Sequence, residues 1–158
     1  MILKNIFLFV TLFLLWTLLV YLMHRLAHIR HRANVLYYFH VAHHKVDYLK
    51  ERNRKFKWYY LLFYFGGIRE TLDVILILTI PLLIVCFIYP PLAVFLIGFH
   101  YIYEVFLSEG LLDHNPSVKG KVTQFFSWGN YHLTHHKTWR YNFSLMITLW
   151  DYVFKTKK

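Results

Sequence analysis

The stretch HRLAHIRHRANVLYYFHVAHH, residues 24–44, decides how this chain is interpreted, because it places six histidines directly after an apolar run. That run, Ile6–Met23, holds 18 residues without a charged side chain. A hydrocarbon core about 30 Å thick is crossed by about 20 helical residues, so the run, slightly extended, predicts a membrane span. No small-residue cleavage site follows it, and we therefore expect an anchor rather than a signal peptide.

The composition also points to a membrane protein. The chain has 158 residues, enough for one domain over residues 1–158, and it is 58% hydrophobic and 21% aromatic, which exceeds the usual values for a soluble domain. Basic loops beside membrane spans account for the net charge of +10 as well, so no nucleic-acid partner is expected. The single cysteine, Cys86, lies in an apolar run and is expected to be a buried hydrophobe.

A second apolar region, residues 74–103, runs for 30 residues without Asp, Glu, Lys or Arg. It is too long for one crossing and short for two. Pro90 and Pro91 cannot continue a helix and predict a turn, which gives a hairpin of two spans, roughly residues 71–89 and 91–107. The segment WYYLLFYF, residues 58–65, is too short to cross and is expected at the interface. The predicted fold is an all-α integral membrane bundle with about three spans.

The orientation follows from the lysines and arginines, which gather between the first two spans and after the third. Both regions are predicted to be cytoplasmic, with the N-terminus and residues 89–91 on the other side of the membrane. Every histidine outside the spans then falls on the cytoplasmic face. The cationic run from Lys45 to Lys57 is expected to face lipid headgroups or to dock an acidic electron donor.

The histidines are grouped in a way that predicts a metal centre. Eight of the eleven lie in three boxes, HRLAH (24–28), HVAHH (40–44) and HLTHH (132–136). Helical residues three and four apart share a face, so each box is expected to aim its rings together. With a ninth histidine they exceed the needs of one tetrahedral zinc, and two metal ions are predicted. Imidazole suits zinc, copper, nickel and iron, so the residues alone do not name the metal. The candidates are His24, His28, His40, His43, His44, His114, His132, His135 and His136.

The three boxes and the following NFSLMITLWDYVFKT resemble the fatty acid hydroxylase/sterol desaturase superfamily of integral membrane di-iron oxygenases, over about residues 20–156. The resemblance implies that the nine histidines bind two iron ions at the cytoplasmic face, with dioxygen as co-substrate. Three features depart from the family pattern. One span, instead of a further helix pair, precedes the first box; Lys155 replaces a glycine; and Gly110 stands where some members have another histidine.

Four further residues are ambiguous. Glu109 and Asp113 flank the Gly110 position, and either carboxylate could complete a metal site, support a ligand or be solvated. His100 lies within the third span, where an ionisable group marks either function or a helix-packing hydrogen bond. His31 is off the face of the first box and is expected to be solvated or to contact lipid headgroups.

These features predict an enzyme that uses dioxygen to hydroxylate or desaturate a lipid, such as a fatty acyl chain or a sterol. The chain contains no Rossmann glycine fingerprint and no haem-domain pattern, so a separate reductase or small redox protein is expected to supply electrons. The alternatives are a non-catalytic membrane metal binder, a family member without activity, and a carotenoid hydroxylase. The resemblance to the carotenoid hydroxylases around LWDYVF is weaker.

Overall fold

The computed structural model describes residues 2–46, 56–64 and 67–158. Most of the predicted cationic run, residues 47–55, and Phe65 of the predicted interfacial segment lie outside the described residues. All named elements of the described part are helices, with one isolated bridge between Phe126 and Ile147. The all-α prediction is confirmed.

Three helical segments are long and apolar enough to cross a membrane: Ile2–Ala27, Ile68–Ile88 and Pro90–Asp113. The first is the single helix α1 (Ile2–Ala27). The second joins α4 (Ile68–Val74), the π-helix η3 (Ile75–Thr79) and α5 (Ile80–Ile88). The third joins α6 (Pro90–Ile102) and the π-helix η4 (Tyr103–Asp113). Three spans were predicted and three are found.

The spans are longer than predicted, and at the C-terminal ends of the first and third the added turns include buried residues. The first helix continues past Met23, since His24 and Ala27 are fully buried. The second and third spans are separated at Tyr89, and α6 begins at Pro90. Proline is tolerated at a first helical position because its missing N–H would have no partner there. The predicted turn is confirmed.

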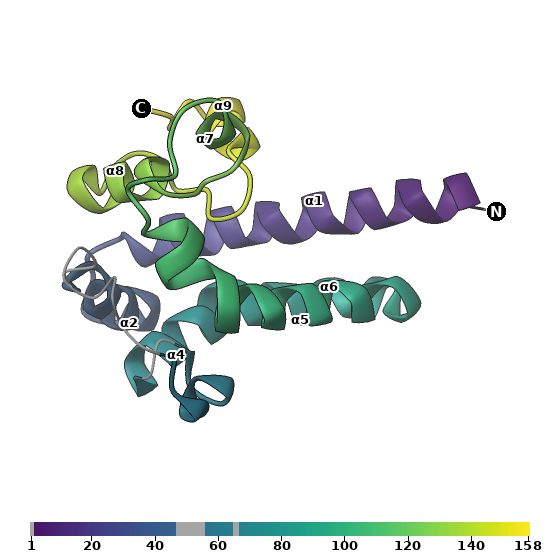
Figure 1. Ribbon diagram of the computed structural model, residues 1–158, viewed down its shortest axis with the longest axis horizontal. Helices are drawn as coiled ribbons and strands as arrows, with labels where there is room; N and C mark the ends of the chain where they lie inside the picture. Colours follow the sequence, from purple (N-terminus) through teal and green to yellow (C-terminus); the bar gives the residue numbers. More distant parts are fainter. Residues whose placement is uncertain (1, 47–55, 65–66) are drawn as a thin grey trace.

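The helix α1 runs beside the α5–α6 hairpin, and the N-terminus and the hairpin turn lie at the same end (Figure 1). Trp16 is buried at the centre of this contact, and its indole N–H donates to the Leu78 carbonyl at 3.0 Å. Val20 on α1 and Val85 on α5 belong to the same core. The opposite side of the hairpin exposes large apolar side chains, such as Phe87 at 87%, as expected for helices that face lipid.

The shorter helices gather at the other end of the spans (Figure 1). The helix α2 (Val35–His44) begins after Asn34, whose side chain accepts a hydrogen bond from the Tyr37 N–H. The predicted interfacial segment contains a short 3₁₀-helix, η1 (Trp58–Leu61). The C-terminal region contributes α7 (Val122–Phe125), α8 (Asn130–Thr138) and α9 (Leu149–Val153). This end of the molecule carries the predicted histidine boxes.

Candidate metal centre

Nine of the eleven histidines come together from four parts of the chain. The last turn of α1 and the residue after it supply two, α2 supplies three, the residue after η4 supplies one and α8 supplies three. Within the described residues they form two groups, and in each group the ligand atoms lie within 4.8 Å of one another. The first group is His24, His28, His40, His44 and His135, and the second is His43, His114, His132 and His136.

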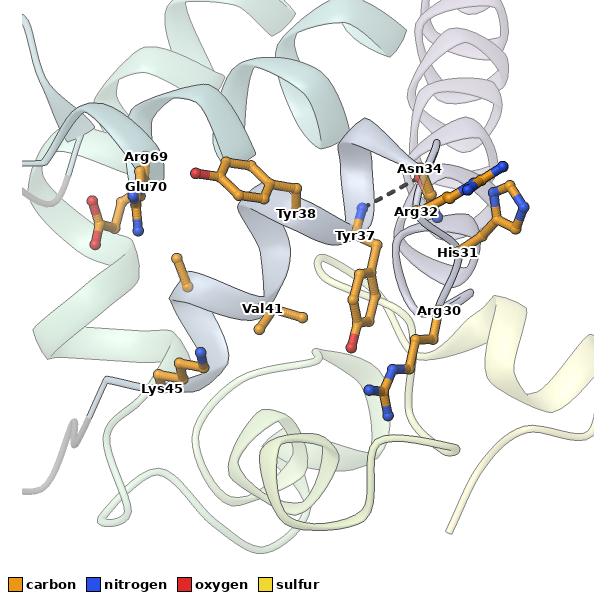
Figure 2. A pocket seen from close by; sticks show the side chains of 11 residues that line it. Arg30, His31, Arg32, Asn34, Tyr37, Tyr38, Val41, Lys45, Arg69 and Glu70 are labelled. Carbon is orange, nitrogen blue, oxygen red and sulfur yellow. Dashed lines mark hydrogen bonds between the residues drawn. The ribbon is translucent and has the colours of Figure 1, made fainter.

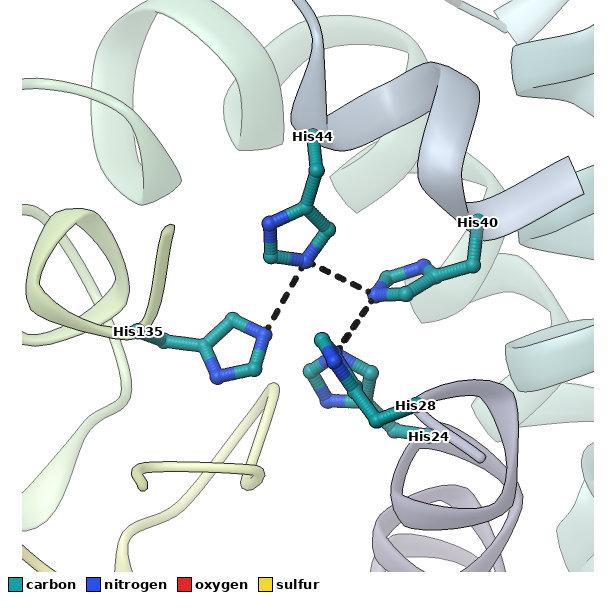
Figure 3. A group of neighbouring side chains, drawn as sticks. All are labelled: His24, His28, His40, His44 and His135. Atoms are coloured by element: carbon teal, nitrogen blue, oxygen red, sulfur yellow. Dashed lines mark hydrogen bonds between the residues drawn. The ribbon is translucent and has the colours of Figure 1, made fainter. Parts of the chain in front are cut away.

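In the first group the rings point toward a common centre (Figure 3). The Nε2 atom of His40 lies 3.0 Å from that of His24, 3.1 Å from that of His28 and 3.0 Å from that of His44. The Nε2 atoms of His44 and His135 are 3.2 Å apart. Two nitrogen ligands at right angles, each about 2.1 Å from a metal ion, would be about 3.0 Å apart. The spacing therefore fits ligands around one ion.

Two backbone carbonyls fix the orientation of rings in the first group. The Nδ1 atom of His24 lies 2.5 Å from the carbonyl oxygen of Phe143, and the Nδ1 atom of His135 lies 2.7 Å from that of Tyr141. A carbonyl oxygen only accepts hydrogen bonds, so Nδ1 must carry the proton in both rings. The Nε2 lone pair is then available to a metal ion.

A buried carboxylate fixes a third ring. The Nδ1 atom of His40 is 3.0 and 3.2 Å from the two carboxylate oxygens of Asp73 on α4. A carboxylate that accepts from a metal-binding histidine orients the ring and raises its basicity. Asp73 is not among the site residues predicted from the sequence. An acidic residue inside a predicted span is costly, and that cost is the signal that could have found it.

The second group has the same close spacing. The Nε2 atom of His136 is 3.1 Å from that of His114 and 3.1 Å from that of His132. The ring of His43 is 4.8 Å from the ring of His136, measured between centroids. The two groups adjoin, because His44 of the first stacks on His136 at 4.2 Å.

The spacing had predicted that the histidines of each box point together. This prediction is wrong for two of the three boxes, whose histidines are divided between the two groups. In HVAHH, His40 and His44 join the first group and His43 joins the second. Helical residues four apart differ by about 40° in direction, whereas residues three apart differ by about 60° on the opposite side. A pair four apart therefore stays together, while the remaining histidine can turn toward a neighbouring centre. In HLTHH the pair joins the second group and His135 joins the first.

Burial keeps these histidines neutral. It lowers the pKa of His28 and of His43 from 6.5 to about 3, and neighbouring histidines contribute to the shift. Burial lowers the pKa of His135 to about 4. The pKa is lowered for the same main reason in His40, His44, His114, His132 and His136. Neutral imidazole is the form that binds a metal ion, so both groups fit metal sites at neutral pH.

Asp151 in α9 organises the loop that supplies the two carbonyls. It is fully buried, and each of its carboxylate oxygens accepts two hydrogen bonds. One oxygen accepts from the Phe143 N–H at 2.8 Å and the Thr156 hydroxyl at 2.6 Å. The other accepts from the Ser144 N–H and the Tyr131 hydroxyl, both at 2.8 Å. Asp151 thus holds the backbone on which His24 and His135 depend.

The same C-terminal segment is fastened to α1. The Thr156 hydroxyl lies 2.9 Å from the Tyr21 hydroxyl, and the ring of Phe154 stacks on Tyr21 at 5.0 Å. The Trp150 indole N–H donates to the Thr17 hydroxyl at 3.0 Å. The sequence pattern from Trp150 to Thr156 therefore connects α9 to the helix that carries the first histidine box.

A model of the fatty acid hydroxylase family matches residues 9–156, nearly the whole chain. The chain belongs to the fatty acid hydroxylase family. Comparison with curated proteins and with solved structures finds no significant match. Membership supports oxidative chemistry on lipids, hydroxylation or desaturation, and the family is typically iron-dependent. The histidine groups fit a metal site of that kind.

His100 lies outside both histidine groups of this fatty acid hydroxylase family member. It is buried, its Nε2 atom is 2.9 Å from the Thr79 hydroxyl, and its ring packs edge-on against Trp16 at 5.7 Å. Its Nδ1 atom is 3.9 Å from a carboxylate oxygen of Glu104, which is also buried. These contacts connect the second and third spans to α1.

The two carboxylates that flank Gly110 lie in η4. Asp113 accepts a hydrogen bond from the Tyr103 hydroxyl, and Glu109 is partly buried. Neither belongs to the groups of converging ligand atoms found in the described part of the chain. His31 is exposed and also lies outside these groups, as the sequence predicted.

A small cavity of about 40 Å³ adjoins the histidines. Its polar lining consists of four histidines, three from the second group and His40 from the first, together with three carboxylic residues and a tyrosine. Its apolar lining comes from the second span and from the residues before α9. The polar residues are His40, His43, His114, His132, Asp73, Glu104, Asp113 and Tyr103, and the apolar residues are Val74, Ile77, Leu78, Leu145 and Met146.

Proposed function

We propose that the chain is a di-iron enzyme that hydroxylates or desaturates a lipid, such as a fatty acyl chain or a sterol, with dioxygen as co-substrate. One observation carries this proposal: two adjoining groups of neutral histidines lie beside a cavity that is also lined by apolar side chains. A metal pair needs the first feature, and an unactivated hydrocarbon substrate needs the second.

The proposed ligands are the nine histidines of the two groups. Two six-coordinate ions offer about twelve positions, so nine imidazoles leave about three for other ligands. When bound, two iron ions would supply the oxidising power for attack on a C–H bond with dioxygen. The chain itself contributes the orientation of the rings, through Asp73 and the carbonyls held by Asp151.

The cavity wall is proposed to position the substrate. Val74, Ile77 and Leu145 face the space beside His43 and His132. A single water needs about 10–15 Å³ of such space, so a cavity of about 40 Å³ accepts dioxygen or a short part of a hydrocarbon chain. Apolar walls favour the hydrocarbon and exclude water from the reacting carbon.

The reaction also needs two electrons from outside the chain. Hydroxylation consumes one dioxygen, two electrons and two protons, and it yields the hydroxylated lipid and one water. Desaturation consumes the same reactants, removes two hydrogens from the lipid and yields two waters. We propose a separate reductase or small redox protein as the electron donor, because the sequence carries no nucleotide-binding fingerprint.

The distribution of lysines and arginines supports a cytoplasmic location for the metal face. Residue 90, at the hairpin turn, should then be accessible from the other side of the membrane. A cysteine introduced at that position should react with an impermeant reagent from that side. Reaction from the cytoplasm alone would contradict this orientation.

Activity can be tested in cells that express the protein with a competent electron donor. Under ¹⁸O₂, lipid mass spectrometry should detect a hydroxylated product carrying the label, or a lipid that has lost two hydrogens. His136→Ala should abolish the product while the protein still enters the membrane, since the apolar spans are unchanged. If metal-loaded protein gave no oxygen-dependent lipid change with several donors, a non-catalytic metal binder would be the better description.

A further inference from the structure

We propose that a basic pocket beside α2 binds the phosphate-bearing headgroup of an anionic membrane lipid. The pocket has a volume of about 640 Å³. Four cationic side chains line it, Arg30, Arg32, Lys45 and Arg69, together with one acid, Glu70 (Figure 2). It is separate from the cavity beside the histidines, and the inference does not depend on the proposed catalytic activity.

The cations lie at the level where lipid headgroups are found. Arg30 and Arg32 follow the end of the first span, Ala27, by three and five residues. Arg69 is the second residue of the second span. Consecutive spans cross in opposite directions, so the end of the first and the start of the second are on one side of the membrane. Cations at this depth interact favourably with anionic headgroups.

The positive charge of the pocket is not balanced within the described residues. All four cations are exposed, and no ion pair with an acidic side chain is found for any of them in that part of the chain. The guanidinium of Arg69 lies over the ring of Tyr38 at 5.6 Å, which holds the group at the pocket wall. Four like charges around one concave surface favour an anion, and Arg matches the geometry of phosphate oxygens.

The loop that carries two of the arginines is held in place. The Asn34 amide donates to the carbonyls of Leu26 and Ile29, each at 2.8 Å, and its oxygen accepts from the Tyr37 N–H. These bonds tie the segment between α1 and α2 at both ends. Less ordering is then needed on binding, which favours affinity for a small ligand.

The shape of the site favours a headgroup over a protein partner. Its volume falls within the range of about 300–1,000 Å³ that is usual for small-molecule sites. Tyr37 and Tyr38 add amphipathic rings that suit the boundary between headgroups and hydrocarbon. A phosphate with its glycerol fits this combination of cations and phenol groups.

The test compares lipids of different headgroup charge on the purified full-length protein in a neutral detergent. Native mass spectrometry or a titration should show tighter binding of phosphatidylglycerol than of phosphatidylcholine with the same acyl chains. The double exchange Arg30→Gln and Arg69→Gln should weaken phosphatidylglycerol binding roughly tenfold or more. Arg30→Lys with Arg69→Lys should keep most of the preference.

The matched control is Lys119→Gln with Lys155→Gln, which removes the same charge from exposed positions outside the pocket and should leave binding unchanged. Circular dichroism and gel filtration check that each variant is folded. If the double arginine variant were misfolded, the single exchange Arg32→Gln on the exposed loop should still weaken binding several-fold.

Several results would overturn the inference. Equal affinity for the two lipids would show that the pocket does not select anionic headgroups, and so would unchanged binding in the folded arginine variants. If glycerol phosphate bound as tightly as the lipid, the site would be one for a soluble phosphate. If the arginine variants lost binding to an acidic polypeptide but bound the lipid as before, the pocket would be a protein-docking surface instead.

Discussion

The two histidine groups come from the same part of the molecule, but their surroundings differ. In the first group, three rings are held from behind by the carbonyls of Phe143 and Tyr141 and by the carboxylate of Asp73. In the second group, three of the four histidines line the cavity, whereas only His40 of the first group does. The first group therefore has three rings oriented by a carbonyl or carboxylate acceptor, and the second supplies most of the histidines that line the cavity.

The largest expected effect follows from removing a single proposed ligand, from either the first or the second group. Purified protein should hold about two transition-metal ions, and His135→Ala and His43→Ala should each release both. Both ions depend on α2 and α8, because each of these helices supplies histidines to both groups. Elemental analysis measures the content, with the exposed His31→Ala as the matched control. One ion left after His43→Ala would show that the groups are independent, and full content after either exchange would exclude these boxes as ligands.

A smaller effect is expected from Asp151→Asn, which acts on the first group through the loop. The amide replaces one acceptor oxygen by a donor that faces existing donors, so buried hydrogen bonds are lost at a cost of about 3 kcal/mol. Metal affinity should fall about 10- to 100-fold, first in the ion that His24 and His135 would bind. Chelator titration should then release the ions at a lower chelator concentration than in the unaltered protein.

Tyr131→Phe is the control for Asp151, because it removes only one of the four donors to the carboxylate. It should cost about 1 kcal/mol and leave both ions bound. Simultaneous release of both ions in Asp151→Asn, at an unchanged chelator concentration, would mean that the loop does not position the first group.

Asp73→Asn should have a milder effect on the same group. The amide oxygen still accepts from the Nδ1 of His40, but it is a weaker acceptor than a carboxylate. We expect metal affinity about tenfold lower, with the helical content unchanged. Asp73→Ala removes the acceptor and should have the larger effect of the two. Equal metal affinity in both variants and the unaltered protein would show that metal binding by His40 does not depend on the hydrogen bond to Asp73.

Much of this arrangement was predictable from the sequence, because it depends on local patterns. The apolar runs and the Pro90–Pro91 turn predicted three spans, and the boxes predicted where histidines would gather. Asp73 was missed because its partner His40 lies 33 residues away, and periodicity carries no information on such pairs. Asp151 was noted only as part of a family pattern, since its role requires the folded loop.

The start of α8 was also not predictable. Gly129 precedes this helix with φ of 55°, and a Cβ atom there would lie 2.2 Å from the Val118 carbonyl oxygen. Only glycine fits both the backbone conformation and the close contact. A single glycine before NYHLTHH gives no such signal in the sequence, because the Val118 backbone is brought to it by tertiary structure.

The smallest expected effect concerns the cavity beside the second group. Leu145 is partly buried and lines the cavity but is not a proposed ligand, so Leu145→Phe should occupy space proposed for the substrate while all nine histidines remain. Metal content should stay unchanged, while lipid turnover should fall roughly tenfold, since small displacements of a reacting carbon are costly. Leu145→Met is the matched control, because methionine has a similar volume and adapts its shape. Product analysis by mass spectrometry measures the effect, and it also reports any shift in the position attacked. If Leu145→Phe left turnover unchanged, the substrate would bind elsewhere. The cavity would then give no reason to assign the substrate side to the second group.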